Sequence, residues 1–187
     1  MISSVEEVAR WKNARAGWAR LALTAAWNTY TPNAFWVVEG FACLLGQFEF
    51  DLARRTSRLG SNDSSRIDIV ASAKPGELIP WTKWVAMKRL DFNRIAANQE
   101  QKIRIASSVH MGQGFTATHL SMFYAQSAMV ARYLYEAEDG KYRRKLLEFV
   151  ANYYTGKMDK LDFEQAFGVS GKDLGPKIEA YARKLVH

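Results

Sequence analysis

The chain has 187 residues, of which 48% are hydrophobic and 24% charged, and it carries a formal net charge of +7. This length allows one domain with a sizeable core, and the composition excludes a disordered chain. No apolar run approaches the ~20 residues of a transmembrane helix, and a lone cysteine, Cys43, excludes an internal disulfide.

The start of the chain carries acidic residues where a signal peptide carries basic ones. We therefore expect a soluble protein, cytoplasmic by default, without a membrane span. The chain opens directly into a predicted helix, so a longer protein with its own targeting signal upstream is an open alternative.

Residues 1–56 predict a helical hairpin. Apolar residues recur at helical spacing over 5–27, and a second apolar helix is expected from the Thr31-Pro32-Asn33 turn to about residue 55. Residues 57–80 are rich in Gly, Ser, Asn and Pro and predict an irregular loop, within which the alternation over 66–71 (RIDIVA) predicts one short strand or hairpin.

Residues 81–187 predict a helical lobe, and the whole chain a single, mainly α domain. Short helices are expected at 81–87 and 90–97, followed by an ambiguous stretch over 98–115. Longer helices follow from residue 118 to the Asp139-Gly140 turn and over 142–155. A short helix at 161–167 precedes a last helix, which begins either at the Ser170–Asp173 capping box or at Pro176.

Glu39 is the one carboxylate in the apolar run 35–45. Burying an unpaired carboxylate costs several kcal/mol, on the order of the whole stability of a small domain. We therefore expect Glu39 to have a partner: a metal ion, an Arg or Lys side chain, or backbone amides.

The segment around Glu39, WVVEGFA at 36–42, resembles the W-x-x-E-G-x-A helix of the gluzincin, or thermolysin-like, metallopeptidases. The segments IPWTKWVAMKRLDF (79–92), FYAQSAMVARYL (123–134), KLLEFV (145–150) and FEQAFGVS (163–170) are similar to the C-terminal helical lobe of that clan. The resemblance implies that Glu39 is a third zinc ligand and that Tyr124 faces the metal, where it stabilises an oxyanion. The alternative for Tyr124 is a core aromatic on an amphipathic helix.

The zinc-binding HExxH motif of the clan is absent, because none of the three histidines precedes Glu39. Arg20 falls where the first histidine would stand. An Arg20–Glu39 ion pair is therefore one hypothesis, since guanidinium binds carboxylate well in partly buried places. The alternative is that each side chain reaches solvent separately.

His110 and His119 could complete a zinc site with Glu39 only if the fold brings them together, and otherwise they are surface or capping residues. No nucleophile elbow, P-loop or dinucleotide fingerprint is present. No cofactor is expected, and zinc is implied only by the resemblance.

Basic residues gather in two clusters, which are candidate anion-binding sites or simply solvated surfaces. The first comprises Arg54, Arg55, Arg58 and Arg66, and the second Lys141, Arg143, Arg144 and Lys145; the candidates for anion binding are Arg54, Arg55, Arg58, Lys141, Arg143 and Arg144.

These observations predict a metallopeptidase-like domain without HExxH, a pseudoenzyme that acts as a binding or structural module. Its partner would be another protein, or a portion of a longer protein that supplies HExxH. One alternative is a basic helical module that binds nucleic acid or another anionic polymer. Another is a residual zinc peptidase that uses Glu39 with ligands from elsewhere.

Overall fold

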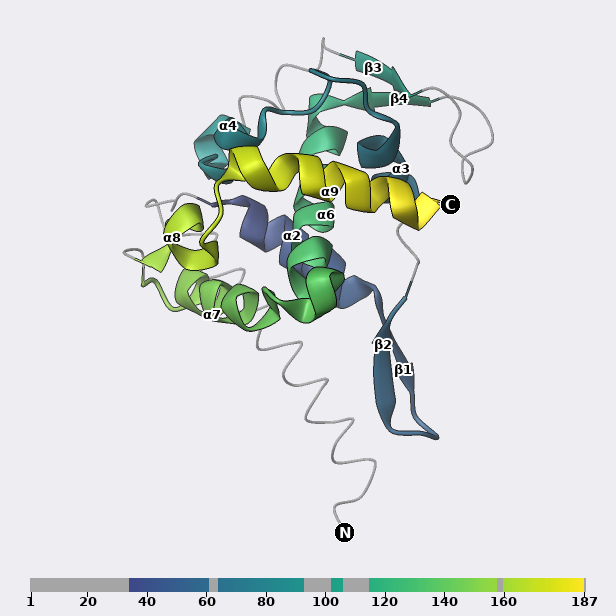
Figure 1. Cartoon of the computed structure of the whole chain (residues 1–187), viewed down its shortest axis with the longest axis vertical. Helices are drawn as coiled ribbons and strands as arrows, with labels where there is room; N and C mark the ends of the chain where they lie inside the picture. The colour runs from purple at the N-terminus through teal and green to yellow at the C-terminus, as the bar shows by residue number, and fades with distance from the viewer. Residues whose placement is uncertain (1–33, 61–63, 93–101, 106–114, 158–159, 187) are drawn as a thin grey trace.

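A computed structural model describes residues 34–60, 64–92, 102–105, 115–157 and 160–186 (Figure 1). These ranges are mainly helical, as predicted. The predicted helix over 5–27, including Arg20, lies outside them, as does the end of the predicted helix at 90–97. The helices are α2 (Trp36–Gly46), α3 (Ser64–Ser72), α4 (Trp81–Val85), α6 (His119–Gly140), α7 (Arg143–Tyr154), α8 (Phe163–Phe167) and α9 (Gly171–Val186).

Two antiparallel hairpins accompany the helices. In the first, β1 (Phe48–Asp51) pairs with β2 (Thr56–Leu59), so that Glu49 lies opposite Arg58. In the second, β3 (Lys102–Ile105) pairs with β4 (Phe115–Thr118). The second hairpin accounts for part of the stretch over 98–115 that the sequence left ambiguous.

The predicted helix to residue 55 is wrong beyond Gly46, where α2 ends and the first hairpin begins. Residues 48–51 (FEFD) alternate apolar and acidic side chains, which suits a strand with one face towards the protein. Phe48 packs edge-on against Tyr135 with ring centroids 5.4 Å apart. Over residues 48–51, the alternation of apolar and acidic side chains therefore agrees with the local structure better than the apolar content of the segment does.

The strand predicted at 66–71 is also wrong, because these residues belong to α3 and not to an irregular loop. Four consecutive side chains, Ile67 to Val70, are buried, including Asp68 with 0% exposure. A strand packed on one face would leave alternate residues exposed. A helix that packs against both α6 and α9 instead buries most of its circumference.

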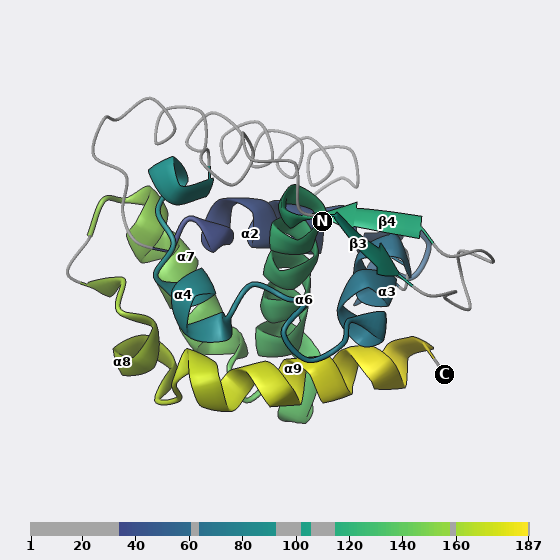
Figure 2. The same cartoon turned by 90° about the horizontal axis from the view of Figure 1, so that it is seen from above.

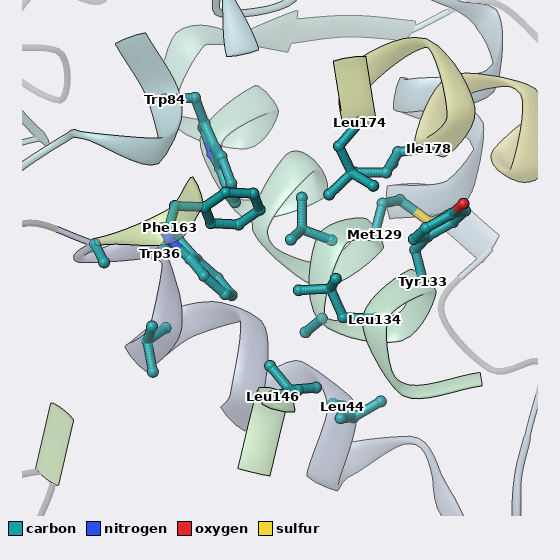
Figure 3. Packing of buried hydrophobic residues seen from close by; sticks show 14 of the residues in the cluster. Trp36, Leu44, Trp84, Met129, Tyr133, Leu134, Leu146, Phe163, Leu174 and Ile178 are labelled. Carbon is teal, nitrogen blue, oxygen red and sulfur yellow. The ribbon is translucent and has the colours of Figure 1, made fainter. Parts of the chain in front are cut away.

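The long helix α6 is the centre of the molecule, with α2 on one side and α9 on the other (Figure 2). Its buried residues include small ones that let neighbouring helices approach. Figure 3 shows side chains of α6 and of the helices around it meeting in the core, among them Trp36, Trp84, Met129, Leu146, Phe163 and Ile178. Trp36 stacks on Phe149 of α7 at 5.7 Å and packs against Trp84 of α4 at 5.3 Å.

Gln126 of α6 fixes the loop that precedes α4. Its side-chain amide donates to the carbonyl oxygen of Ile79 at 2.9 Å, and its Oε1 accepts from the Ile79 amide at 3.0 Å. Gln126 is fully buried, so these two bonds satisfy backbone groups that water does not reach.

The helix boundaries predicted for the C-terminal lobe are largely confirmed. Thr118 caps α6 by accepting from the Ser121 amide, and Gly168 ends α8 in the left-handed conformation with φ of 71°. Ser170 caps the start of α9, where its hydroxyl accepts from the Asp173 amide and donates to the Asp173 carboxylate; only the first of these bonds belongs to the predicted capping box. The alternative start at Pro176 is wrong, because α9 begins at Gly171 and Pro176 lies within it.

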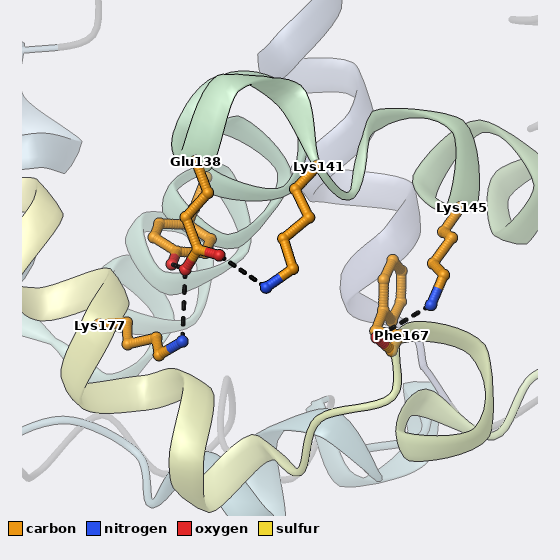
Figure 4. Close-up of polar contacts among 6 residues, drawn as sticks. Glu138, Lys141, Lys145, Phe167 and Lys177 are labelled. Atoms are coloured by element: carbon orange, nitrogen blue, oxygen red, sulfur yellow. Dashed lines mark hydrogen bonds and ion pairs between the residues drawn. The ribbon is translucent and has the colours of Figure 1, made fainter.

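The Asp139-Gly140 turn ends the regular part of α6 as predicted, since the backbone leaves the helical region at Ala137. Glu138, with φ of 49°, accepts hydrogen bonds from Tyr133 at 2.6 Å, Lys141 at 2.9 Å and Lys177 at 3.3 Å (Figure 4). This carboxylate therefore ties the turn after α6 to α9.

Candidate functional site

The candidate site is built around Glu39, which lies in the first turn of α2. Trp36, Val37, Gly40 and Leu44 turn towards the core, whereas Glu39 and Cys43, one helical turn apart, are only half-buried. A carboxylate in the first turn is favoured by the exposed amides of the helix N-terminus. Glu39 thus belongs to the rim of the core rather than to its centre.

Gly40 lets α2 approach α6 closely. A Cβ atom at this position would lie 2.5 Å from the carbonyl oxygen of Ser127 and 3.3 Å from Cβ of Ala131. No side chain larger than hydrogen fits there unless the two helices separate. Tyr124 lies one turn before Ser127 on α6, so this contact sets the separation between the helices that carry Glu39 and Tyr124.

Two arginines provide positive charge near Glu39. Arg66 is on α3, and Arg89 is in the short helical turn after α4, where its guanidinium lies 5.6 Å from the centre of the Phe35 ring. Burial raises the pKa of Glu39 above its ordinary value, and the charges of Arg66 and Arg89 oppose that rise. The net pKa shift is upward, so burial outweighs the attraction of both arginines.

Two tyrosines complete the cluster. Burial, and after it the charge of Glu39, raises the pKa of Tyr124. Burial and the charge of Glu39 raise the pKa of Tyr154, at the end of α7, to about 12. Both phenols therefore stay protonated at neutral pH and can donate hydrogen bonds.

The cluster of Glu39, Tyr124, Tyr154, Arg66 and Arg89 is named the Glu39 cluster below. Its members come from α2, α6, α7, α3 and the turn after α4. It contains hydrogen-bond donors of two kinds and one carboxylate, a combination suited to binding polar groups of a ligand. Phe92 packs edge-on against Tyr124 with centroids 5.8 Å apart, which adds an apolar wall.

The resemblance links Glu39 and Tyr124 to one site, but no sequence pattern places the other three members beside them. Arg66 was expected in a basic cluster and in a strand, and neither Arg89 nor Tyr154 was singled out. Tyr153 is buried, with 7% exposure. The adjacent Tyr154 is half-buried, and no local pattern distinguishes the two.

Of the residues predicted by number as partners of Glu39, only His119 falls within the described ranges. Arg20 and His110 lie outside those ranges. His119 is the first residue of α6, directly after the capping Thr118. Within the part of the chain that the structure describes, no three His, Cys, Asp or Glu side chains are grouped as metal ligands.

The two basic clusters lie on the surface, where most of their members contact acidic or aromatic residues. Arg58 pairs with Glu49 at 2.8 Å and Arg54 with Asp51 at 3.6 Å. In the second cluster Lys141 pairs with Glu138 and Arg144 with Glu148, while Arg143 lies 4.6 Å over the Tyr135 ring.

No helix in the described ranges is long and apolar enough to cross a membrane. Comparison of the chain with protein-family models, curated proteins and solved structures finds no match.

Proposed function

We propose that this chain is a gluzincin-like domain without HExxH, which binds an extended polypeptide at the Glu39 cluster and does not hydrolyse it. The observation that carries the proposal is the close packing of α2 on α6 at Gly40, which places Glu39 and Tyr124 near enough for the charge of Glu39 to raise the pKa of Tyr124. The resemblance assigns these two residues, 85 positions apart, to one site: the third zinc ligand and the tyrosine that faces the metal.

Gly40 adds support, because the glycine of W-x-x-E-G-x-A here has a structural role that only glycine can fill. Trp36, the first residue of the same motif, is fully buried against α4, α7 and α8. The motif therefore serves both to seat α2 in the core and to hold Glu39 beside α6.

The chemistry of the cluster favours binding over hydrolysis. A zinc peptidase needs a polarised water, whose pKa the metal lowers, and a carboxylate base next to it. The neighbours of Glu39 in the described ranges are instead guanidinium groups and neutral phenols, which can hold a peptide carbonyl or carboxylate by hydrogen bonds. If zinc were bound with ligands from elsewhere, Glu39 would be one ligand and the metal would polarise a water or a carbonyl.

Metal content and ligand binding test the proposal together. We expect the purified chain to hold substoichiometric zinc, to melt at the same temperature in zinc and in chelator, and to leave fluorescein-labelled casein intact. Labelled casein should nevertheless bind, as measured by fluorescence anisotropy, and Tyr124→Phe should weaken that binding. Tyr135→Phe is the matched control, because Tyr135 lies beside Arg143 rather than near Glu39.

Glu39→Gln gives an independent readout. Since the pKa of Glu39 is raised in the folded state, the ionised carboxylate destabilises the fold as pH rises through the range above its ordinary pKa. The glutamine variant should therefore be at least as stable as the parent at pH 7. Stoichiometric zinc that Glu39→Gln abolishes, or cleavage of casein, would refute the binding-only proposal in favour of the peptidase.

A further inference from the structure

The first hairpin, formed by β1 and β2, extends away from the body of the molecule (Figure 1). Its root is anchored: Phe48 packs against Tyr135, and the Gly60 amide donates to the Gln47 carbonyl at 2.9 Å. Arg143 covers the same Tyr135 ring and donates from Nε to the Tyr135 carbonyl oxygen. Four residues of strand add ~13 Å of reach beyond that root.

The far end of this hairpin, residues 51–56, is named the hairpin tip. The Asp51 carboxylate accepts from the Arg54 amide at 3.0 Å, which closes the turn, and Arg55 adopts φ of 52°. Leu52 is 75% exposed, more than any other large hydrophobic residue in the described ranges. An apolar side chain so exposed at the end of a projecting arm is typical of a contact surface.

Arg54 and Arg55 share the turn with Leu52, and Arg58 lies on β2 nearer the root. The side chains of Arg54 and Arg58 are 83% and 82% exposed. Their pairs with Asp51 and Glu49 are surface ion pairs, which are worth little and exchange readily for another anion. Among the described residues no carboxylate pairs with Arg55. The hairpin tip therefore presents guanidinium groups to any phosphate that approaches.

We propose that the hairpin tip binds the surface of an anionic lipid bilayer. Leu52, Arg54 and Arg55 share the turn at the end of the arm, so Leu52 can enter the acyl boundary while the long arginine side chains reach back to the phosphates. Arginine suits this depth because its fork of donors binds phosphate in a bidentate manner.

A nucleic acid is the less suitable partner for this surface. A β-ribbon that reads a groove places polar side chains against base edges and phosphates. Here the turn begins with Leu52-Ala53, and an exposed leucine gains little from contact with phosphates. The proposal is independent of the function assigned to the Glu39 cluster, and neither depends on the other.

Cosedimentation with lipid vesicles tests this inference on the full chain. We expect binding to phosphatidylcholine vesicles that contain about 30% phosphatidylserine, weak binding to phosphatidylcholine alone, and loss of binding as salt is raised. Arg55→Ala should lower the partition coefficient about fivefold, since one basic residue near such a surface contributes about that factor. Leu52→Ser should lower it further.

Lys184→Ala and Leu90→Ser are the matched controls. Lys184 is an exposed cation on α9, and Leu90 is a 62% exposed leucine away from the hairpin. Both should retain the parent partition coefficient, and all four variants should retain the parent melting temperature. Three results would overturn the proposal: equal binding to neutral vesicles, no effect of Arg55→Ala, or tighter binding to duplex DNA than to vesicles at the same salt concentration.

Discussion

Replacing Gly40 with alanine tests whether the close approach of α2 and α6 shapes the candidate site. The added methyl group would lie 2.5 Å from the Ser127 carbonyl oxygen and 3.1 Å from the Ser127 carbonyl carbon. These are backbone atoms in the middle of α6, so neither can move without moving the helix. Overpacking of this kind costs about 1–3 kcal/mol and sometimes more.

Gly46→Ala is the matched control, because Gly46 ends the same helix and no atom lies within 4 Å of its added Cβ. Alanine stabilises a helix by about 1 kcal/mol relative to glycine. Both substitutions gain some of this stability, although not the same amount. We therefore expect Gly46→Ala to be neutral or stabilising and Gly40→Ala to be about 3 kcal/mol less stable than the control.

Urea denaturation gives this difference directly, and thermal melting should separate the two variants by roughly 6–12 °C for a chain of this size. Tyr124 offers a second readout, since its pKa is raised partly by the charge of Glu39. A spectrophotometric titration should find that rise reduced in Gly40→Ala, because the helices have separated. Equal stability of the two alanine variants would show that the spacing of α2 and α6 is not set by Gly40.

Gln126→Leu should cost about 2–4 kcal/mol in urea denaturation, since it leaves the buried amide and carbonyl of Ile79 unpaired, whereas Gln165→Leu on the surface should stay within about 0.5 kcal/mol of the parent. Glu138→Gln should lower stability by about 1 kcal/mol above pH 5, after allowance for the 33% exposure of this side chain. The hydrogen bond from Tyr133, then that from Lys141, lowers the pKa of Glu138 from its ordinary 4.5 to about 2, so the difference should disappear as pH falls from 4.5 to 2. Ser170→Ala should cost about 1 kcal/mol in thermal melts, because it removes the acceptor for the Asp173 amide. An unchanged denaturation midpoint for Gln126→Leu, a pH-independent effect of Glu138→Gln, or an unchanged melt for Ser170→Ala would contradict the corresponding contact.

The helices of the C-terminal lobe were predictable because their signals are local. Each signal acts within four residues of the helix end that it defines: the Ser170 cap of α9, the left-handed Gly168 after α8 and the turn at Asp139-Gly140. In the same way, Trp81 to Val85 forms the short helix expected after Pro80. Local chemistry of this kind does not depend on what packs nearby.

The errors arose where distant contacts decide the structure. In α3, Asp68 is fully buried, and the helices that pack against α3 lie far along the chain. The order Ile67-Asp68-Ile69 has the apolar–polar alternation of a strand, which explains the wrong prediction. In the first hairpin, the turn has no glycine, and Arg55 adopts a positive φ that the sequence does not predict. Cross-strand contacts such as Glu49–Arg58 and the packing of Phe48 accompany the strands there instead.

The residues of the candidate site also fall into those that the sequence identifies and those that only tertiary contacts bring in. Glu39 stood out as a carboxylate in an apolar run, and the resemblance linked it to Tyr124. Arg66, Arg89 and Tyr154 join them through tertiary structure alone, since each lies on a different element and none has a distinctive neighbour in sequence. A sequence pattern can identify a residue whose burial is unfavourable, such as Glu39. Only the fold identifies the charged groups that partly compensate for that burial.

The opposing effects of burial and of the two arginines on the pKa of Glu39 bear on the role of this residue. Burial raises the pKa of this carboxyl even though two arginines lie close enough to oppose the rise. At neutral pH the ionised side chain therefore makes the fold less stable than a neutral residue of the same shape would, so folding does not account for a glutamate at this position. The proposed binding role would account for it, because a half-buried carboxylate near two guanidinium groups and two phenols is already partly desolvated. A ligand that offers an amide or a cation to Glu39 would gain a strong hydrogen bond at little further cost in ordering the site.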